Sequence, residues 1–248
     1  MRTVGVDLAA DPASTAVASV DWSAGRAGVT KLVLPADDPA VLDAVAGADK
    51  AGIDCPLGWP DAFVSFVTEH RTGHVRVPDG VAGRDWRRGL GFRYTDEAVR
   101  GAIGLIPLSV AADRIGHPAM RCAGLLAGLA ARGVPVDRDG SGVVVEVYPA
   151  GSLKCWGLPY RGYKRAAGRG NLGPLVDALL RAAPWLDLRA FDGLCRRSDH
   201  ALDAVVAALT ARAASIGLVS RPPADRAPAA RTEGWIALPT EPIAKLAP

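Results

Sequence analysis

The first part of the chain contains three short runs of apolar and β-branched residues that are separated by turn residues. These runs cover residues 2–8, 14–21 and 28–34. Their spacing is typical of antiparallel strands joined by hairpins. A stretch with helical periodicity follows over residues 39–48, and a fourth apolar run covers residues 50–54. The sequence therefore predicts the element order β-β-β-α-β.

A helix between the third and fourth strands requires a crossover connection, so the fourth strand should lie parallel to the first. The carboxyl ends of parallel neighbours meet at the same edge of a sheet. The first strand ends at Asp7 and the fourth ends at Asp54. We therefore expect these two side chains to lie close together.

The next region predicts an insertion or lid over about residues 61–140. Residues 71–93 are rich in Gly, Arg and Pro and predict a long surface loop. Helical patterns follow over residues 95–101 and 111–132. Residues 142–148 give the strongest strand signal, an apolar run broken by Glu146, and we expect a central strand there.

The last third of the chain predicts two more helices, a linker and a short strand. The helices cover residues 171–181 and 198–215, with Ser198 as the N-cap of the second. Residues 220–233 have the Pro/Ala/Arg composition of a linker, and residues 234–238 predict a late strand. We interpret residues 1–248 as a single α/β domain.

Composition excludes several protein classes. The chain has 248 residues, 49% hydrophobic and 22% charged, with a net charge of +3. This is a globular composition, and the charge is too small to indicate a nucleic-acid partner by itself. The longest uncharged apolar run, residues 122–131, is too short for a membrane span. Four scattered cysteines indicate neither zinc nor disulfides, so we expect a soluble, cytoplasmic protein without a membrane partner.

The placement of acidic residues indicates chemistry. Besides Asp7 and Asp54, the last long helix carries Asp199 and Asp203 four residues apart, which places them on one face. His200 shares that face with Asp203. Converging carboxylates repel each other unless a cation intervenes, so their pattern favours two Mg²⁺ or Mn²⁺ ions. Each acid alone also has an ordinary explanation as a turn former or helix cap.

Two such ions can activate a water molecule and stabilise the leaving oxygen of an in-line displacement at phosphorus. The sequence therefore predicts a metal-dependent nuclease that hydrolyses phosphodiester bonds. The candidate catalytic residues are Asp7, Asp54, Glu146, Asp199 and Asp203. The candidate metal ligands are Asp7, Asp54, Asp199, His200 and Asp203.

Six ordered segments resemble the domain-of-unknown-function 429 family of predicted ribonuclease H-fold nucleases. They are GVDLA (5–9), GIDCPLGWP (52–60), FRYTD (92–96), EVYPAGSLKCWGLPY (146–160), SDHALDAVVAALTA (198–211) and EGWIALP (233–239). The resemblance implies a ribonuclease H-like fold: a mixed five-stranded sheet with helices on both faces and a helical or loop insertion. The family's nuclease activity is itself inferred from its fold.

The pattern is also similar to that of RuvC-type Holliday-junction resolvases. Asp7 and Asp54 match their acids on strands one and four, and His200 with Asp203 matches an acid or histidine three residues before an aspartate. Either Asp199 or His200 is then the helix ligand. Glu146 has three candidate roles: a fifth ligand, a group that orients the ligands, or the partner of an arginine. Since these resolvases are dimers, a homodimer is one assembly that the resemblance allows.

Two basic regions are candidate substrate contacts. Residues 154–170 carry basic side chains and no acid, interleaved with aromatic residues: Lys154, Trp156, Tyr160, Arg161, Tyr163, Lys164, Arg165 and Arg169. Basic groups neutralise phosphates and aromatic rings stack on bases, although such aromatic residues also pack on a core. Arg93 and Asp96 lie in a second region. We expect Arg93, Asp96, Lys154 and Lys164 to line the site for DNA or RNA.

Two other functions remain open. Asp7 followed by Ser14 and Thr15 faintly resembles the phosphate-binding start of sugar kinases and actin-like ATPases, but the chain has neither a P-loop nor a G-x-G-x-x-G motif. A non-catalytic nucleic-acid-binding protein that retains the fold is the second alternative. Clustered acids argue against it, because unpaired carboxylates reduce stability.

Overall fold

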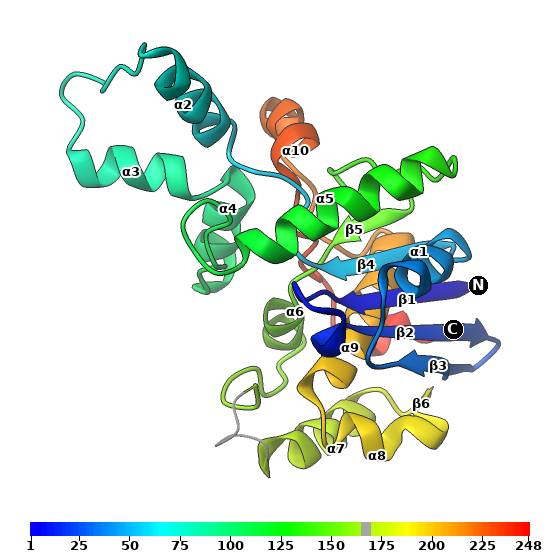
Figure 1. The fold of residues 1–248 in the computed structure, drawn as a ribbon. Coiled ribbons are helices and arrows are strands. Elements are labelled where there is room, and N and C mark those ends of the chain that lie inside the picture. Colours follow the sequence, from blue (N-terminus) through cyan, green and yellow to red (C-terminus); the bar gives the residue numbers. More distant parts are fainter. Residues whose placement is uncertain (165–169) are drawn as a thin grey trace.

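The protein is built around a mixed six-stranded sheet with the strand order β5-β4-β1-β2-β3-β6 (Figure 1). The computed structural model describes residues 1–164 and 170–248. The strands are β1 (Arg2–Asp7), β2 (Ala16–Ser23), β3 (Arg26–Val33), β4 (Lys50–Asp54), β5 (Val144–Glu146) and β6 (Leu186–Asp187). The expected five strands are corrected to six, because the short β6 adds to β3 in parallel.

The predicted order of the first elements is confirmed. Strands β1, β2 and β3 are antiparallel neighbours, and β4 lies parallel to β1. The crossover helix α1 (Asp38–Ala46) begins after Asp37, whose side chain accepts a hydrogen bond from the Ala40 amide. The parallel register pairs Asp7 with Asp54, so the expected proximity of the two strand ends is confirmed.

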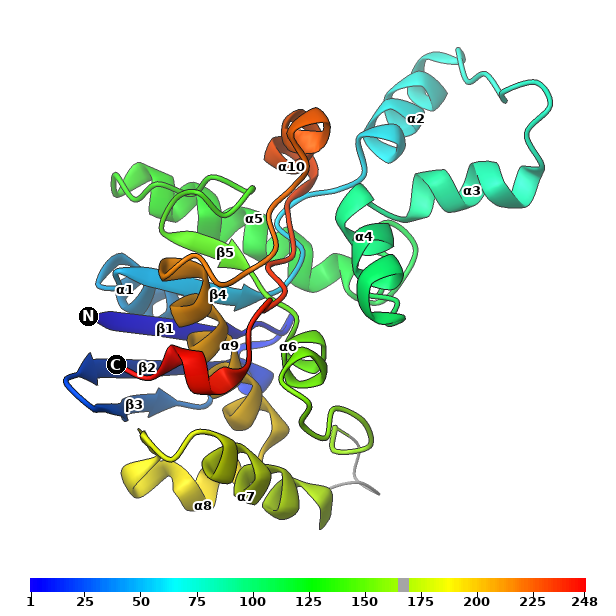
Figure 2. The same cartoon turned by 180° about the vertical axis from the view of Figure 1, so that it is seen from behind.

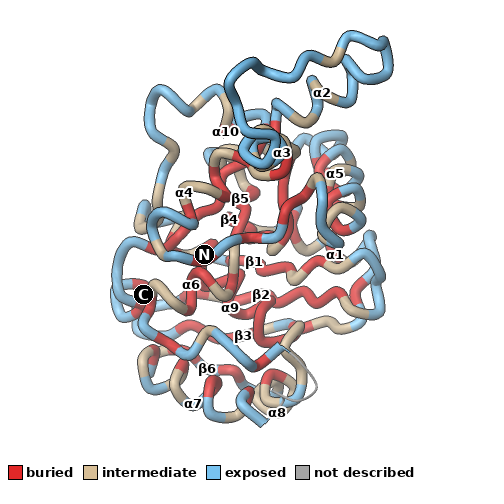
Figure 3. The backbone as a smooth tube through the Cα atoms, turned by 90° about the vertical axis from the view of Figure 1, so that its left-hand side faces the viewer, coloured by how far each residue is buried: buried red, intermediate tan, exposed pale blue. Residues whose placement is uncertain are grey.

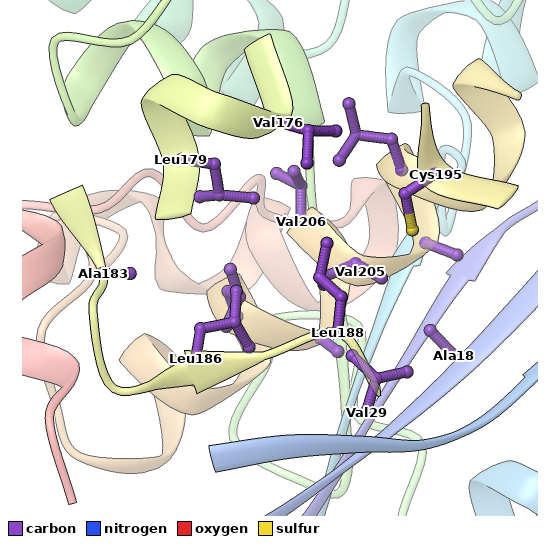
Figure 4. Packing of buried hydrophobic residues seen from close by; sticks show 14 of the residues in the cluster. Ala18, Val29, Val176, Leu179, Ala183, Leu186, Leu188, Cys195, Val205 and Val206 are labelled. Atoms are coloured by element: carbon purple, nitrogen blue, oxygen red, sulfur yellow. The ribbon is translucent and has the colours of Figure 1, made fainter. Parts of the chain in front are cut away.

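Helices cover both faces of the sheet (Figure 2). On one face, α1 and α5 (Gly116–Ala131) pack on the apolar side chains of β1 and β4. On the other face lies α9 (Asp199–Ser215), with α6 (Pro149–Cys155), α7 (Leu172–Ala182) and α8 (Asp192–Cys195) around it. Figure 4 shows the core on this side, where Val205 and Val206 of α9 lie among side chains of α7, β6 and the sheet. The predicted helices of the last third, with Ser198 as N-cap of α9, are confirmed.

Two glycines allow α9 to approach the sheet closely. Gly5 and Gly52 are register neighbours on β1 and β4. A Cβ atom at Gly52 would lie 2.6 Å from the carbonyl oxygen of Ala207, and one at Gly5 would clash with the backbone of α9. Because side chains two residues apart in a strand share a face, Asp7 and Asp54 point to the same side as these glycines. The close approach therefore brings α9 beside both carboxylates.

The insertion is more helical than predicted. It contains α2 (Asp61–Thr72), α3 (Gly83–Gly91), α4 (Tyr94–Ile103) and α5. The loop predicted over 71–93 is corrected by α3, whose Trp86 ring meets the edge of Phe66 on α2 at 5.9 Å. Helix α3 thus forms despite the low helix propensity of its glycines. Helices α2 and α3 project from the rest of the chain and are mostly exposed (Figures 1 and 3).

Strand β5 is an end strand of the sheet, so the expectation of a central strand is wrong. It is nevertheless buried, because the later segment 235–238 covers its outer side. Ile236 forms an isolated parallel bridge with Glu146, and the Ala237 amide donates to the Glu146 carbonyl oxygen. The strand predicted over 234–238 is therefore reduced to isolated bridges.

The linker predicted over 220–233 contains a helix, α10 (Ala227–Glu233). Its last residue, Glu233, is buried and takes part in the polar network described below. No helix in the described parts of the chain is both long and apolar enough to cross a membrane.

Candidate metal centre

Three aspartates from distant parts of the sequence meet at the carboxyl ends of β1 and β4. Asp7 and Asp54 end these strands, and Asp203 comes from the second turn of α9. One carboxylate oxygen from each lies within 4.8 Å of the others. The exposed fractions of the side chains are 13%, 20% and 2%, respectively. Oxygen ligands around Mg²⁺, Mn²⁺ or Ca²⁺ lie about 2.0–2.6 Å from the ion, so this spacing and donor chemistry fit a hard divalent cation.

A lysine ammonium group already lies beside these carboxylates. The Nζ atom of Lys164 is 2.6 Å from Asp203 Oδ2 and 3.9 Å from Asp54 Oδ2. The Tyr163 hydroxyl donates to Asp203 Oδ1 at 2.8 Å. Both oxygens of Asp203 therefore have a protein partner. Lys164 was expected to contact substrate, and the structure brings it into the acidic cluster itself.

His200 contacts the cluster from its outer side. Its Nδ1 atom lies 2.6 Å from Asp7 Oδ2, and its side chain is 41% exposed. The hydrogen bond to Asp7 raises the pKa of His200, burial opposes this, and the charges of Asp7, Asp199 and Asp203 add to the increase. Asp199 does not belong to the three-carboxylate cluster, and within the described residues it forms no side-chain hydrogen bond or ion pair. Its position in the first turn of α9 fits a favourable interaction with the helix dipole.

Two carboxyl groups of the cluster, those of Asp54 and Asp203, resist ionisation. Burial raises the pKa of Asp54 well above its usual range; Lys164 lowers it, and the neighbouring charges of Asp7 and Asp203 raise it further. Burial likewise raises the pKa of Asp203 to about 6, although Lys164 and the Tyr163 hydroxyl counteract this. For Lys164, burial favours the neutral form, but Asp203 and Asp54 outweigh it and raise its pKa. This combination favours the binding of additional positive charge.

Glu146 is outside the metal centre and is the partner of a buried arginine. The Arg93 guanidinium donates two hydrogen bonds to Glu146, at 2.8 and 2.7 Å, and its Nη2 atom lies 2.9 Å from Asp96 Oδ1. All three side chains are at most 3% exposed. Glu146 also accepts from the Leu57 amide at 3.0 Å and so fixes the loop after Asp54. Among its three candidate roles, the geometry matches the partner of an arginine.

The expected substrate contacts of Arg93 and Asp96 are inconsistent with their burial. Asp96 accepts from the Arg93 amide at 2.9 Å and thereby caps the first turn of α4. Lys154 is also engaged, because its Nζ donates to the Ile103 carbonyl oxygen and lies 5.1 Å from the centre of the Tyr160 ring. We therefore assign structural roles to these three residues. Only Lys164 of the four lies at the three-aspartate cluster.

The basic segment that contains Lys164 is partly a packing element. Trp156 and Tyr163 are 8% and 2% exposed and belong to the core on the α9 side of the sheet. The aromatic residues therefore support the loop that carries Lys164. Arg165 and Arg169 lie outside the described residues.

Sequence reasoning missed Glu233, which it assigned to a linker. The carboxylate of Glu233 accepts from the amides of Asp61 and Tyr94, at 2.9 and 2.8 Å, and these are the first residues of α2 and α4. Its carbonyl oxygen accepts from Arg93 Nη1 at 3.0 Å. One carboxylate thus joins the starts of two insertion helices to the segment beside β5. The only signal in the sequence was the EGWIALP segment that starts with this residue.

Comparison with known proteins identifies the family. A family model described as a protein of unknown function, DUF429, matches residues 5–227. No curated protein and no solved structure matches the chain. The matched residues include Asp7, Asp54 and Asp203 and cover most of the sequence. The chain therefore belongs to the DUF429 family.

Proposed function

We propose that the protein is a nuclease that hydrolyses phosphodiester bonds of nucleic acid with Mg²⁺ or Mn²⁺ bound at Asp7, Asp54 and Asp203. The convergence of these three carboxylates within 4.8 Å, from two strands and a helix, carries the proposal. A cluster of like charges, in which the pKa values of Asp54 and Asp203 are raised, is costly in a scaffold without a cation, and metal binding would give the cluster a function.

Two divalent ions, when bound, supply an activated water molecule and stabilisation of the leaving oxygen. The protein's own residues provide the remaining functions. Asp7, Asp54 and Asp203 hold the ions, and Tyr163 fixes the orientation of Asp203. Lys164 neutralises the cluster in the metal-free protein and is placed to contact a phosphate once the carboxylates bind metal. His200 orients Asp7, and its raised pKa favours a cation that attracts the phosphate.

The proposed fold is ribonuclease H-like, and the order of acids along the chain supports it. The first acid ends β1, the second ends β4 after the crossover, and the third is on the last long helix. The proposed partner is DNA or RNA. A homodimer and a cytoplasmic location stay predictions.

One observation favours a second candidate function, a nucleic-acid-binding protein without catalysis. The Lys164 ammonium already neutralises part of the cluster's charge, so the fold does not strictly require a metal. In this alternative, Lys164 and His200 would contact phosphates and the aspartates would only position these two side chains. The two functions differ in whether divalent ions bind.

The test combines metal binding and hydrolysis. We expect Mn²⁺ to bind to the wild type in isothermal titration, and manganese-soaked crystals to give anomalous peaks between Asp7, Asp54 and Asp203. Labelled single- and double-stranded DNA and RNA should be cleaved only when Mg²⁺ or Mn²⁺ is present. Asp7→Asn and Asp54→Asn should abolish both signals, whereas Asp43→Asn on the exposed surface of α1 is the matched control. Metal binding without hydrolysis of any of these substrates would exclude the nuclease.

A further inference from the structure

A small apolar pocket opens directly beside the metal centre. It has a volume of about 150 Å³ and shares Asp54 and Lys164 with the centre. Its apolar walls come from four parts of the chain: Pro56 after β4, Pro107 and Leu108 between α4 and α5, Tyr148 after β5, and Ile236 of the segment beside β5. The insertion therefore contributes one wall of a pocket whose other walls belong to the sheet.

The size of the pocket limits what it can hold. An apolar cavity of about 150 Å³ accommodates one benzene-sized ring. A single six-membered ring therefore fits within the pocket, whereas the fused rings of a purine would extend out of its open side. The two charged groups at its base, Arg93 and Glu146, are paired with each other and leave no free charge for a ligand. Tyr148 lines the pocket, and its hydroxyl makes no hydrogen bond within the described residues, so it is a candidate partner for a polar atom on the ring edge.

We propose that this pocket binds the pyrimidine base of the nucleotide whose phosphate lies at the metal centre. The identity of the ligand rests on the proposed function, because a phosphate bound by Lys164 and by metal at Asp54 would bring its own base next to the pocket. A base can enter only when it is unstacked and unpaired. The inferred substrate class is therefore single-stranded nucleic acid, or an unpaired segment or end, with a pyrimidine at the cleavage site.

Binding of mononucleotides tests the pocket without requiring catalysis. The probes are UMP, dTMP, AMP and dGMP, titrated into the full-length protein with Mg²⁺ and followed by NMR chemical shifts. We expect UMP and dTMP to bind at least tenfold more tightly than AMP and dGMP. Leu108→Trp places an indole in the pocket and should weaken pyrimidine binding at least tenfold. Leu108 is 43% exposed, so the larger side chain does not have to enter the core.

Ile106→Trp is the matched control, since Ile106 is 53% exposed, two residues away, and does not line the pocket. It should bind pyrimidine nucleotides like the wild type, and both variants should unfold at the wild-type temperature. Equal binding of all four nucleotides, no binding of any, or unchanged binding by Leu108→Trp would each overturn the pocket assignment.

Hydrolysis separates this inference from the proposed function. Single-stranded oligonucleotides with one pyrimidine in a run of purines should be cut at the pyrimidine, and the same oligonucleotides in duplex form should resist. Cleavage without base preference would refute the assignment of the pocket to a pyrimidine base, but it would still support the proposed nuclease activity. Pyrimidine-selective binding with no cleavage of any oligonucleotide would refute the nuclease and leave the pocket intact.

Discussion

Replacing Asp203 by asparagine should abolish metal-dependent activity and at the same time stabilise the metal-free protein. Asp203 is 2% exposed, and its pKa of about 6 lies about two units above its ordinary value of 3.8. Two units correspond to about 3 kcal/mol that the ionised form costs in the folded state. Asparagine is uncharged, and its carbonyl oxygen can still accept the hydrogen bond from Tyr163.

The sign of the effect depends on pH. A carboxyl group whose folded pKa is raised above its unfolded value destabilises the protein as the pH rises from the unfolded to the folded pKa. The cost of Asp203 is therefore absent below about pH 4 and complete above about pH 6 to 7. The stabilisation by Asp203→Asn should follow the same window. For a chain of this size, 1 kcal/mol shifts the melting temperature by about 2–4 °C, so the increase near neutral pH is at most about 6–12 °C.

The assay is urea unfolding of the wild type and Asp203→Asn in the presence of EDTA, at about pH 7.5 and at about pH 4. The variant should be more stable by about 1–3 kcal/mol at the higher pH and equal to the wild type at the lower pH. Asp43→Asn, on an exposed helix surface, controls for the loss of a carboxylate and should change little. A variant that is less stable at about pH 7.5, or a difference that does not depend on pH, would refute the electrostatic cost assigned to Asp203.

Three further predictions concern the supports of the centre. Gly5→Ala should destabilise the folded protein by more than about 2 kcal/mol, because its Cβ atom would clash with the backbone of α9. The control is Gly101→Ala, which lies in open space within α4 and should be neutral or stabilising. Thermal denaturation compares the two variants. Arg93→Ala should lower the free energy of unfolding in urea by about 3–5 kcal/mol, because it leaves Glu146 buried without its cation. A variant as stable as the wild type would show that the Arg93–Glu146 ion pair does not stabilise the fold. His200→Ala should lower the rate of hydrolysis more than Asp199→Asn, and the reverse order in steady-state kinetics would reassign the helix residue.

The first four strands could be predicted from the sequence because their signals are local, whereas the short β6 and the edge position of β5 could not. The pattern of apolar runs and the crossover helix place the strand-end residues Asp7 and Asp54 side by side. The helical spacing of the acidic residues in α9 makes Asp203 a third candidate for the same cluster. The pairing of Glu146 with Arg93 joins residues 53 positions apart, and local patterns do not encode it. Glu233 was missed for the same reason. It ends a Pro- and Ala-rich segment that resembles a linker, and its partners, the amides of Asp61 and Tyr94, are far away in the sequence.

The position of Lys164 explains how the proposed metal site can be stable without a metal ion. Burial and the mutual repulsion of the three clustered carboxylates raise the pKa of Asp54 and of Asp203 in the metal-free protein, and the ammonium group 2.6 Å from Asp203 offsets part of that repulsion. Its side chain is 43% exposed, so it can turn away from the carboxylates into solvent. A divalent ion carries twice the charge and binds several oxygens at once, so it should displace the lysine. In that case Lys164→Met should bind Mn²⁺ at least as tightly as the wild type in isothermal titration. Weaker Mn²⁺ binding by this variant would instead show that the lysine helps to hold the carboxylates in place for the ion.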